Sequence, residues 1–202
     1  MRLLVSGQQK VASSFAENGQ PVKFETVNLP SSNAEREASL SALIRERPFL
    51  LLGKREDVAT IMKRLNAGII IFDARIIKLD VPKPRIILAG IHKFEDEQDV
   101  NLLKDAHVYS MQLLHDDSQS ACDAMMEIAK EWPLCFILIS LNVLDPVFAQ
   151  VPNPAYGGMT TRQLLYFVQR LRMLKNFCGA AIIDYEKAMP VAEKLLSELA
   201  VR

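Results

Sequence analysis

The chain contains few of the residues that build metal clusters and disulfide scaffolds. It has three histidines and three cysteines among 202 residues. Cys122, Cys135 and Cys178 are far apart and lie among apolar residues. A zinc site needs closely spaced pairs, and a secreted scaffold needs an even, dense set. We therefore expect three free, buried thiols in a reducing compartment.

The chain also lacks a charge excess and a long apolar run. Its 24 basic residues balance 24 acidic ones, so nothing attracts it as a whole to nucleic acid or to an anionic membrane. No apolar run approaches the roughly 20 residues that span a bilayer. The apolar strand after Arg2 is too short for a signal-peptide core. These absences predict a cytoplasmic protein with neither nucleic acid nor membrane as a partner.

Short apolar runs alternate with segments of helical period. The predicted strands are Leu3–Val5, Val22–Val27, Phe49–Leu52, Gly68–Phe72, Arg85–Ala89, His107–Met111, Leu134–Ser140 and Ala180–Asp184. Several are continuously apolar, which is typical of parallel strands covered by helices on both faces. The predicted helices are Ala34–Glu46 with Asn33 as N-cap, Asp57–Leu65, Glu97–Lys104, Ser118–Glu131, Thr161–Leu174 and one starting near Pro190.

This alternation predicts a three-layer α/β/α sandwich with a mostly parallel sheet of about eight strands. We expect a single domain over residues 1–202. Asp80–Pro84, with two prolines, is expected to be a loop. Thr160 and Gln163 match a capping box, which predicts that a helix begins there.

In such a sheet, ligands bind beyond the carboxyl ends of the strands. One strand end there carries the longest recognisable motif. Ile139–Thr161 contains S-L-N-V-L-D-P-V-F-A and then G-G-M-T-T. It resembles the S-x-D-x-D-x-x-D-P and G-G-L-T segment of ureohydrolases, the arginase, agmatinase and formiminoglutamase family. In that family the first two Asp side chains bridge two manganese ions, and Ser140 and Asn142 stand at these positions.

Two further strand ends resemble metal-ligand segments of the family. F-L-L-L-G-K-R-E is similar to a strand ending in G-G-D-H, which puts Glu56 at the His ligand position. I-I-I-F-D-A-R-I-I is similar to a strand ending in D-A-H-x-D. Asp73 matches its first ligand, whereas Arg75 and Ile77 replace the other two.

The last strand resembles the family's D-x-x-E-x-N-P segment. Asp184 and Pro190 match, and Lys187 stands where an acidic residue meets the substrate guanidinium. The resemblance covers roughly residues 48 to 190 and implies an arginase/deacetylase-like fold. The stretch between Asp73 and Ser140 is shorter than is typical, which implies loss of substrate-pocket residues.

The substitutions remove the chemistry of a binuclear site. Two divalent metals that share a hydroxide need several anionic or imidazole ligands. Ser140 and Asn142 are neutral, Ile77 cannot coordinate, and Arg75 adds a permanent positive charge. We expect an ion pair of Arg75 with Asp73 or Glu56 in place of metal, and no bound manganese or other cofactor.

The residues that match the family are those that shape the backbone. Asp145 after a buried strand can accept N–H groups from the following turn, which Pro146 stiffens. Gly157 and Gly158 suit the turn into the next helix. We expect these structural roles to survive without a metal.

Other polar groups near strand ends have ordinary explanations. His115-Asp116-Asp117 is the best alternative metal cluster by composition, but a solvated turn in which Asp117 or Ser118 caps the next helix is favoured over it. A solvated turn is also favoured over an anion site for Gly53-Lys54-Arg55. His92 is interpreted as a loop residue, and His107 has no special context.

The sequence therefore favours a non-catalytic ureohydrolase-fold protein. It would act by assembly with itself or a related subunit, or by binding a small charged metabolite through its crevice. The alternative is a metal-dependent hydrolase of C–N bonds in guanidino or amidino compounds with a rearranged metal site. A manganese-loading and urea-release experiment separates these hypotheses.

Overall fold

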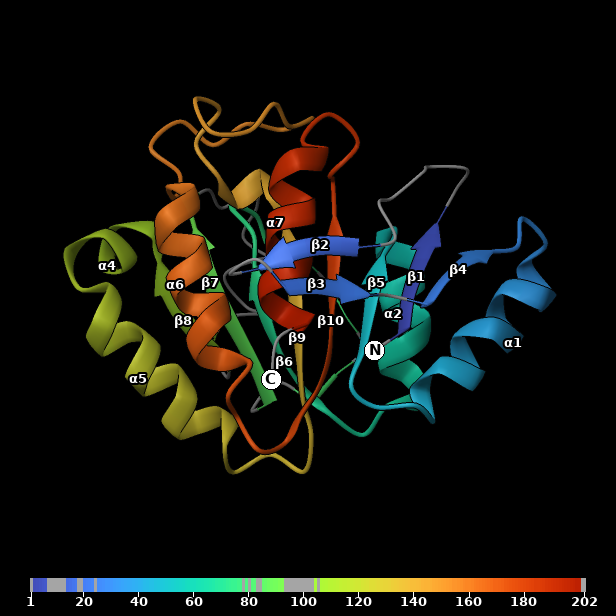
Figure 1. The fold of residues 1–202 in the computed structure, drawn as a ribbon. Coiled ribbons are helices and arrows are strands. Elements are labelled where there is room, and N and C mark those ends of the chain that lie inside the picture. The colour runs from blue at the N-terminus through green and yellow to red at the C-terminus, as the bar shows by residue number, and fades with distance from the viewer. Residues whose placement is uncertain are drawn as a thin grey trace.

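The computed structural model describes residues 2–6, 14–17, 20–23, 25–77, 79, 81–82, 85–92, 104 and 106–200. This part contains a sheet of eight strands in the order β4-β1-β5-β10-β9-β6-β7-β8 (Figure 1). Every neighbouring pair is parallel. The strands are β1 (Arg2–Ser6), β4 (Glu25–Leu29), β5 (Phe49–Leu52), β6 (Gly68–Phe72), β7 (Ile86–Ile91), β8 (His107–Ser110), β9 (Cys135–Ser140) and β10 (Phe177–Ile183). The predicted parallel α/β sheet is confirmed.

The central strands are buried on both faces. Every residue of β5, β6 and β9 is buried, which explains their continuous apolar sequences, because helices exclude water from either side. Cys122, Cys135 and Cys178 are free and buried, as predicted.

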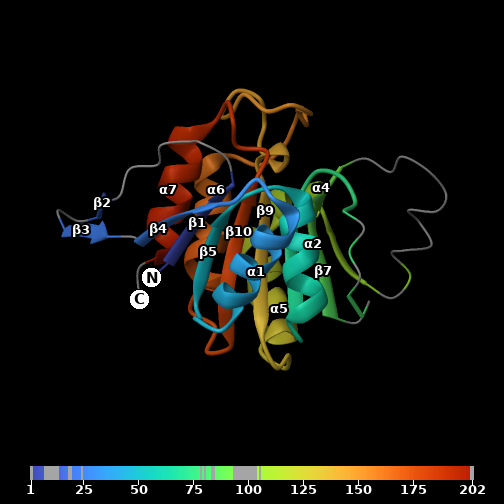
Figure 2. The same ribbon diagram turned by 90° about the vertical axis from the view of Figure 1, so that its right-hand side faces the viewer.

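Helices pack against both faces of the sheet (Figures 1 and 2). α1 (Asn33–Ile44) and α2 (Arg55–Arg64) bury Leu40, Leu43 and Ile61 on one face. The helices on the other face are α4 (Met111–Asp116), α5 (Ser118–Ala129), α6 (Thr161–Leu171) and α7 (Met189–Ala200). No helix in the described ranges is long and apolar enough to cross a membrane.

Several predicted elements differ from the structure. The predicted strand Val22–Val27 is divided between β3 (Gln20–Lys23) and β4, and β3 forms an antiparallel hairpin with β2 (Ser14–Glu17). An apolar run does not itself reveal which strand it pairs with, so this division was missed.

Helix boundaries also shift. α1 begins at Asn33, and Ser32 is its N-cap residue, so the predicted Asn33 cap is wrong. Met111 starts α4, a short helix whose N-cap Ser110 accepts a hydrogen bond from Leu113 N. The predicted helix Glu97–Lys104 lies outside the described residues apart from Lys104, and most of the Asp80–Pro84 loop does too.

The carboxyl ends of the strands meet at one edge of the sheet, at the top of Figure 1. There β9 leads through the short 3-10 helix η2 (Leu141–Val143) into the loop Leu144–Thr160, which we call the β9–α6 loop. The loop ends at Thr160, whose reciprocal bonds with Gln163 form the predicted capping box of α6. This edge of the sheet is where the sequence predicts a site.

Candidate functional site

Asp73 lies immediately after β6 and is fully buried. Its Oδ1 accepts a hydrogen bond from the backbone N–H of Arg75 at 3.1 Å. Burial raises the pKa of this carboxyl to about 6, although the nearby charge of Arg55 opposes the shift. A carboxylate without water around it needs a compensating cation.

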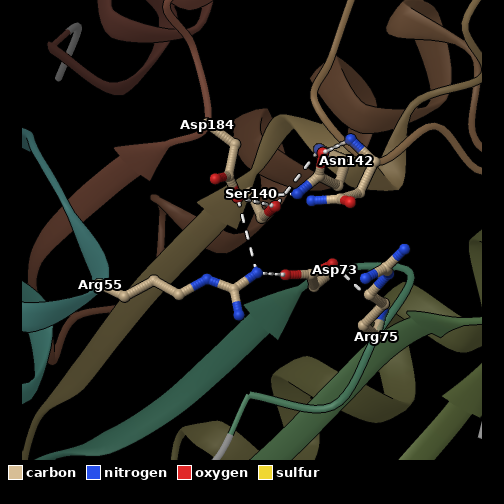
Figure 3. Close-up of polar contacts among 7 residues, drawn as sticks. Arg55, Asp73, Arg75, Ser140, Asn142 and Asp184 are labelled. Atoms are coloured by element: carbon tan, nitrogen blue, oxygen red, sulfur yellow. Dashed lines mark hydrogen bonds and ion pairs between the residues drawn. The ribbon is translucent and has the colours of Figure 1, made fainter. Parts of the chain in front are cut away.

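Arg55 supplies that cation. It is the first residue of α2, and its Nη2 lies 3.3 Å from Asp73 Oδ2 and 3.7 Å from Asp184 Oδ2 (Figure 3). The Arg55 side chain is 42 % exposed, so the guanidinium contacts the buried carboxylate from the solvent side. One permanent positive charge therefore contacts two carboxylates.

Asp184 follows β10 directly and has a left-handed backbone with a φ of 57°. Its Oδ2 accepts hydrogen bonds from Ser140 Oγ at 2.7 Å and from Asn142 Nδ2 at 2.9 Å. Ser140 and Asn142 are both fully buried. They act as neutral hydrogen-bond donors to a carboxylate, which is the opposite of an anionic metal ligand.

These five residues, Arg55, Asp73, Ser140, Asn142 and Asp184, form what we call the polar cluster. They lie at or just after the carboxyl ends of β5, β10, β9 and β6, four strands that are neighbours in the sheet. Parallel strands place their ends at a common edge, and the long Arg55 side chain extends across it (Figure 3). Within the cluster, Oδ2 of Asp184 contacts three donors, and the charges partly balance.

The polar cluster is joined to the β9–α6 loop. Asn142 Oδ1 accepts the backbone N–H of Asn153 at 3.2 Å. Ser140 Oγ accepts the backbone N–H of Asn142 at 3.3 Å, which closes the turn after β9. The loop is therefore held at this edge of the sheet by a side chain of the cluster itself.

Asp145 performs the structural role predicted for it. Its Oδ1 accepts the N–H of Val147 at 2.9 Å, and its Oδ2 accepts the N–H of Gly157 at 2.8 Å. These bonds to Val147 and Gly157 hold the pKa of Asp145 below its usual value. A Cβ on Gly158 would lie 2.7 Å from Asp145 N, so glycine is required there.

Among the described residues, three other predicted site side chains make no hydrogen bond or ion pair with the cluster. The Glu56 side chain is exposed on α2 and lines a hollow with α1 residues Asn33 and Arg36. Ile77 is buried in the core beneath α1 and α2. Lys187 is exposed between β10 and α7.

The segment His115-Asp116-Asp117 lies at the boundary between α4 and α5. His115 lies on α4, with Nε2 3.0 Å from Gly157 O and Nδ1 3.2 Å from Gln163 Nε2. Asp117 Oδ1 accepts the N–H of Ser120 and caps α5, as predicted. Both ring nitrogens of His115 thus have protein partners, which leaves neither for a metal.

The sequence does not predict which arginine pairs with Asp73. The sequence points to Arg75, whereas the structure shows an ion pair with Arg55, and Arg75 contributes its backbone N–H. The predicted solvated turn over Gly53-Lys54-Arg55 is wrong for Arg55, because this residue begins α2 and pairs with Asp73. The available signal is its place near the carboxyl end of β5, which puts Arg55 at this edge of the sheet but does not identify its partner.

The donor set does not fit a binuclear manganese centre. Of the cluster's side chains, Asp73 and Asp184 are anionic, and the Arg55 guanidinium contacts both. Within the described residues, no three His, Cys, Asp or Glu side chains come together to hold a metal. Two divalent ions here would face a fixed positive charge and only two carboxylates.

Comparisons with known proteins agree with this fold. Residues 47–200 match the family model described as the arginase family. No individual curated protein matches significantly. Among solved structures, arginase from Bacillus subtilis has a TM-score of 0.76 and 16% identity, over 89% of this chain and 84% of that chain.

Two other solved structures are similarly related. Formimidoylglutamase from Bacillus subtilis subsp. subtilis str. 168 has a TM-score of 0.78 and 15% identity, over 98% of this chain and 85% of that one. Proclavaminate amidino hydrolase from Streptomyces clavuligerus has a TM-score of 0.73 and 14% identity, over 98% and 90%. At these low identities the TM-scores establish a shared fold and nothing more. The family is identified by the family model, which matches more than half of the sequence. The chain belongs to the arginase family.

Proposed function

We propose that this chain is a non-catalytic member of the arginase family in which the Arg55 guanidinium takes the place of metal ions. The observation that carries the proposal is the contact of one guanidinium with both Asp73 and Asp184. Ser140 and Asn142 complete the hydrogen bonding of Asp184 from inside. The two carboxylates of the polar cluster are thereby compensated by protein groups alone.

The electrostatics of the polar cluster support the absence of metal chemistry. A metal lowers the pKa of bound water only when anionic ligands hold it in place. Asp73 and Asp184 are already paired with a guanidinium that stays protonated in proteins. A metal ion would have to displace Arg55 first, and the neutral side chains of Ser140 and Asn142 would add no charge to hold it.

We propose that the protein acts by assembly, as a homo-oligomer or beside a related subunit in the cytoplasm. The β9–α6 loop supports this, since Val147 is 85%, Phe148 44% and Tyr156 74% exposed. Large apolar side chains gathered on one loop are typical of a surface that binds another protein. The paired carboxylates disfavour the other hypothesis, in which the cluster holds a charged metabolite.

The test combines metal analysis with an activity assay. The purified protein is loaded with manganese, freed of unbound metal and analysed for metal content, and urea release is measured with arginine and agmatine. We expect substoichiometric manganese and no urea above background. An active arginase treated in parallel serves as the control. Stoichiometric manganese together with turnover would instead establish the rearranged metal-dependent hydrolase.

Assembly is tested separately by size-exclusion chromatography with light scattering. We expect a mass above the 22.7 kDa of one chain. Replacing Val147 and Tyr156 with serine should lower the mass if their loop forms the contact. A monomer at all concentrations, alone and with a related subunit, would contradict assembly while leaving the proposal for the crevice intact.

A further inference from the structure

The orientation of the Gln163 amide is determined by the capping box of α6. Gln163 Oε1 accepts the backbone N–H of Thr160 at 3.0 Å and lies 3.1 Å from Thr160 Oγ1. A rotated amide would place N–H groups against the N–H of Thr160. The Oε1 atom therefore faces Thr160, and the Nε2 donor faces outward, 3.2 Å from His115 Nδ1.

This orientation determines the tautomer of His115. The Nδ1 atom faces an amide donor, so it must carry a lone pair. The ring proton is then on Nε2, where it donates to the carbonyl of Gly157 at 3.0 Å. In this arrangement His115 accepts one hydrogen bond and donates another, which requires a neutral ring.

Gly157 is held from both sides by this arrangement. Its N–H donates to Asp145 Oδ2, and its carbonyl accepts from His115 Nε2. Its φ of 75° keeps the loop in a left-handed turn. On the same loop, Asn153 donates to Asn142 of the polar cluster. His115 is therefore a contact that ties α4 to the loop bonded to the polar cluster.

We propose that His115 is a pH-sensitive latch on the β9–α6 loop, closed when the imidazole is neutral and loosened when it is protonated. A protonated ring carries a proton on Nδ1, which would meet the Gln163 amide donor. Either Gln163 gives up its bond to Thr160, or His115 turns away and releases Gly157. The inference goes beyond the proposed function and does not depend on it.

The surroundings of His115 contain several ionisable groups. In the described part of the chain, those on its own helix, on β8, α5 and α6 around it, and in the adjoining segments are Asp116, Asp117, Cys122, Asp123, Glu127, Asp145, Tyr156, Arg162, Tyr166, Arg170, His92, His107 and Tyr109. Hydrogen bonds from backbone N–H groups keep the pKa of Asp145 low, and bonds from Ser120 do the same for Asp117. Both carboxylates remain ionised across the range in which histidines change charge, about pH 5 to 8.

The first measurement is the tautomer itself. Long-range nitrogen–proton NMR of the imidazole at about pH 8 should show His115 with its proton on Nε2 and none on Nδ1. A proton on Nδ1 at that pH would overturn the proposal. His92 and His107 are the other histidines of the chain, so His115→Asn assigns the signals.

The second measurement is amide hydrogen exchange of Asn153 and Gly157 at about pH 8 and about pH 5.5, corrected for intrinsic exchange. Losing one hydrogen bond should reduce protection about fivefold at the lower pH. His115→Asn should abolish this pH dependence. Unchanged protection in the wild type, with NMR showing His115 protonated, would contradict the latch.

Gln163→Glu provides a reciprocal test. Glutamate preserves the capping box, because one carboxylate oxygen accepts the Thr160 N–H. The other oxygen replaces the amide donor and accepts from a protonated Nδ1, so loop protection at about pH 5.5 should be retained. Gln119→Glu adds the same charge at an exposed position of α5 and should behave like the wild type. Equal loss of protection in Gln163→Glu and Gln119→Glu would sink the proposal.

Discussion

The β9–α6 loop and the polar cluster lie at the same edge of the sheet but relate differently to the pattern of the family. In the loop, Asp145, Gly157 and Gly158 match the pattern, and each meets a backbone requirement that the structure shows. In the cluster, Ser140 and Asn142 are neutral where the sequence resemblance predicts metal ligands, and Arg55 pairs with the carboxylates. Backbone turns need only their local hydrogen bonds, whereas adjacent carboxylates need a cation, and a guanidinium can be that cation.

The largest expected effect lies in the loop and tests its backbone requirement. Gly158→Ala places a Cβ 2.7 Å from backbone atoms of Val143, Leu144 and Asp145. We expect a loss of about 3 kcal/mol or more in the free energy of unfolding, because backbone atoms cannot move aside cheaply. Gly157→Ala is the matched control, since nothing lies within 4 Å of its Cβ. Only the left-handed φ opposes that change, at about 1 kcal/mol.

Chemical denaturation of both variants measures the difference. Equal losses for Gly157→Ala and Gly158→Ala would show that close packing against the strand end does not determine the loop.

The second prediction concerns how Asp73 of the polar cluster makes the free energy of unfolding depend on pH. Asp73 has a pKa of about 6 in the folded chain, above the 3.8 of an unfolded aspartate. The folded chain therefore binds this proton more tightly. The protonated Asp73 side chain adds about 2 to 3 kcal/mol to the free energy of unfolding. This contribution is fully present below about pH 4 and is lost as the pH rises through about 6.

Asp73→Asn should lack this contribution. Urea unfolding of both proteins at intervals between about pH 4 and 7.5 gives the difference in unfolding free energy at each pH. That difference should change in favour of the variant as the pH rises. If the unfolding free energies of the wild type and Asp73→Asn changed in parallel with pH, the raised pKa of the buried Asp73 carboxyl would be contradicted.

The smallest of these effects tests Arg55 as the counter-charge. Arg55→Ala removes the partner of a fully buried carboxylate. Because Arg55 itself is 42 % exposed, we expect a loss of about 1 to 2 kcal/mol near pH 7.5. The loss should shrink near pH 5, where Asp73 is protonated. Arg45→Ala, at an exposed position after α1, should change the unfolding free energy little at either pH.

Denaturation at the two pH values separates charge compensation from simple packing. If Arg55→Ala lowered the free energy of unfolding equally at both pH values, the aliphatic stem of Arg55, not its guanidinium, would be what stabilises the polar cluster.

The sequence predicted the parts of this molecule that depend on local chemistry. Continuous apolar runs such as Gly68–Phe72 revealed buried parallel strands, and Asp145 revealed the turn after β9. The pairing of Arg55 was not predictable in this way. It depends on the order β5-β10-β9-β6, which brings residues 55, 73 and 184 together from distant segments. Strand order arises from packing of the whole chain, so local patterns do not contain it.

Titration with Mn²⁺ followed by electron paramagnetic resonance tests the central claim most directly. Free Mn²⁺ gives a sharp six-line spectrum whose intensity falls when protein ligands bind it. If Arg55 occupies the place of the metals, the spectrum of Mn²⁺ with wild-type protein should have the same intensity as that of a buffer blank with the same Mn²⁺ concentration. The titration should extend to about millimolar Mn²⁺, where weak sites would also fill. Loss of two equivalents of signal per chain would show a binuclear centre and contradict the account.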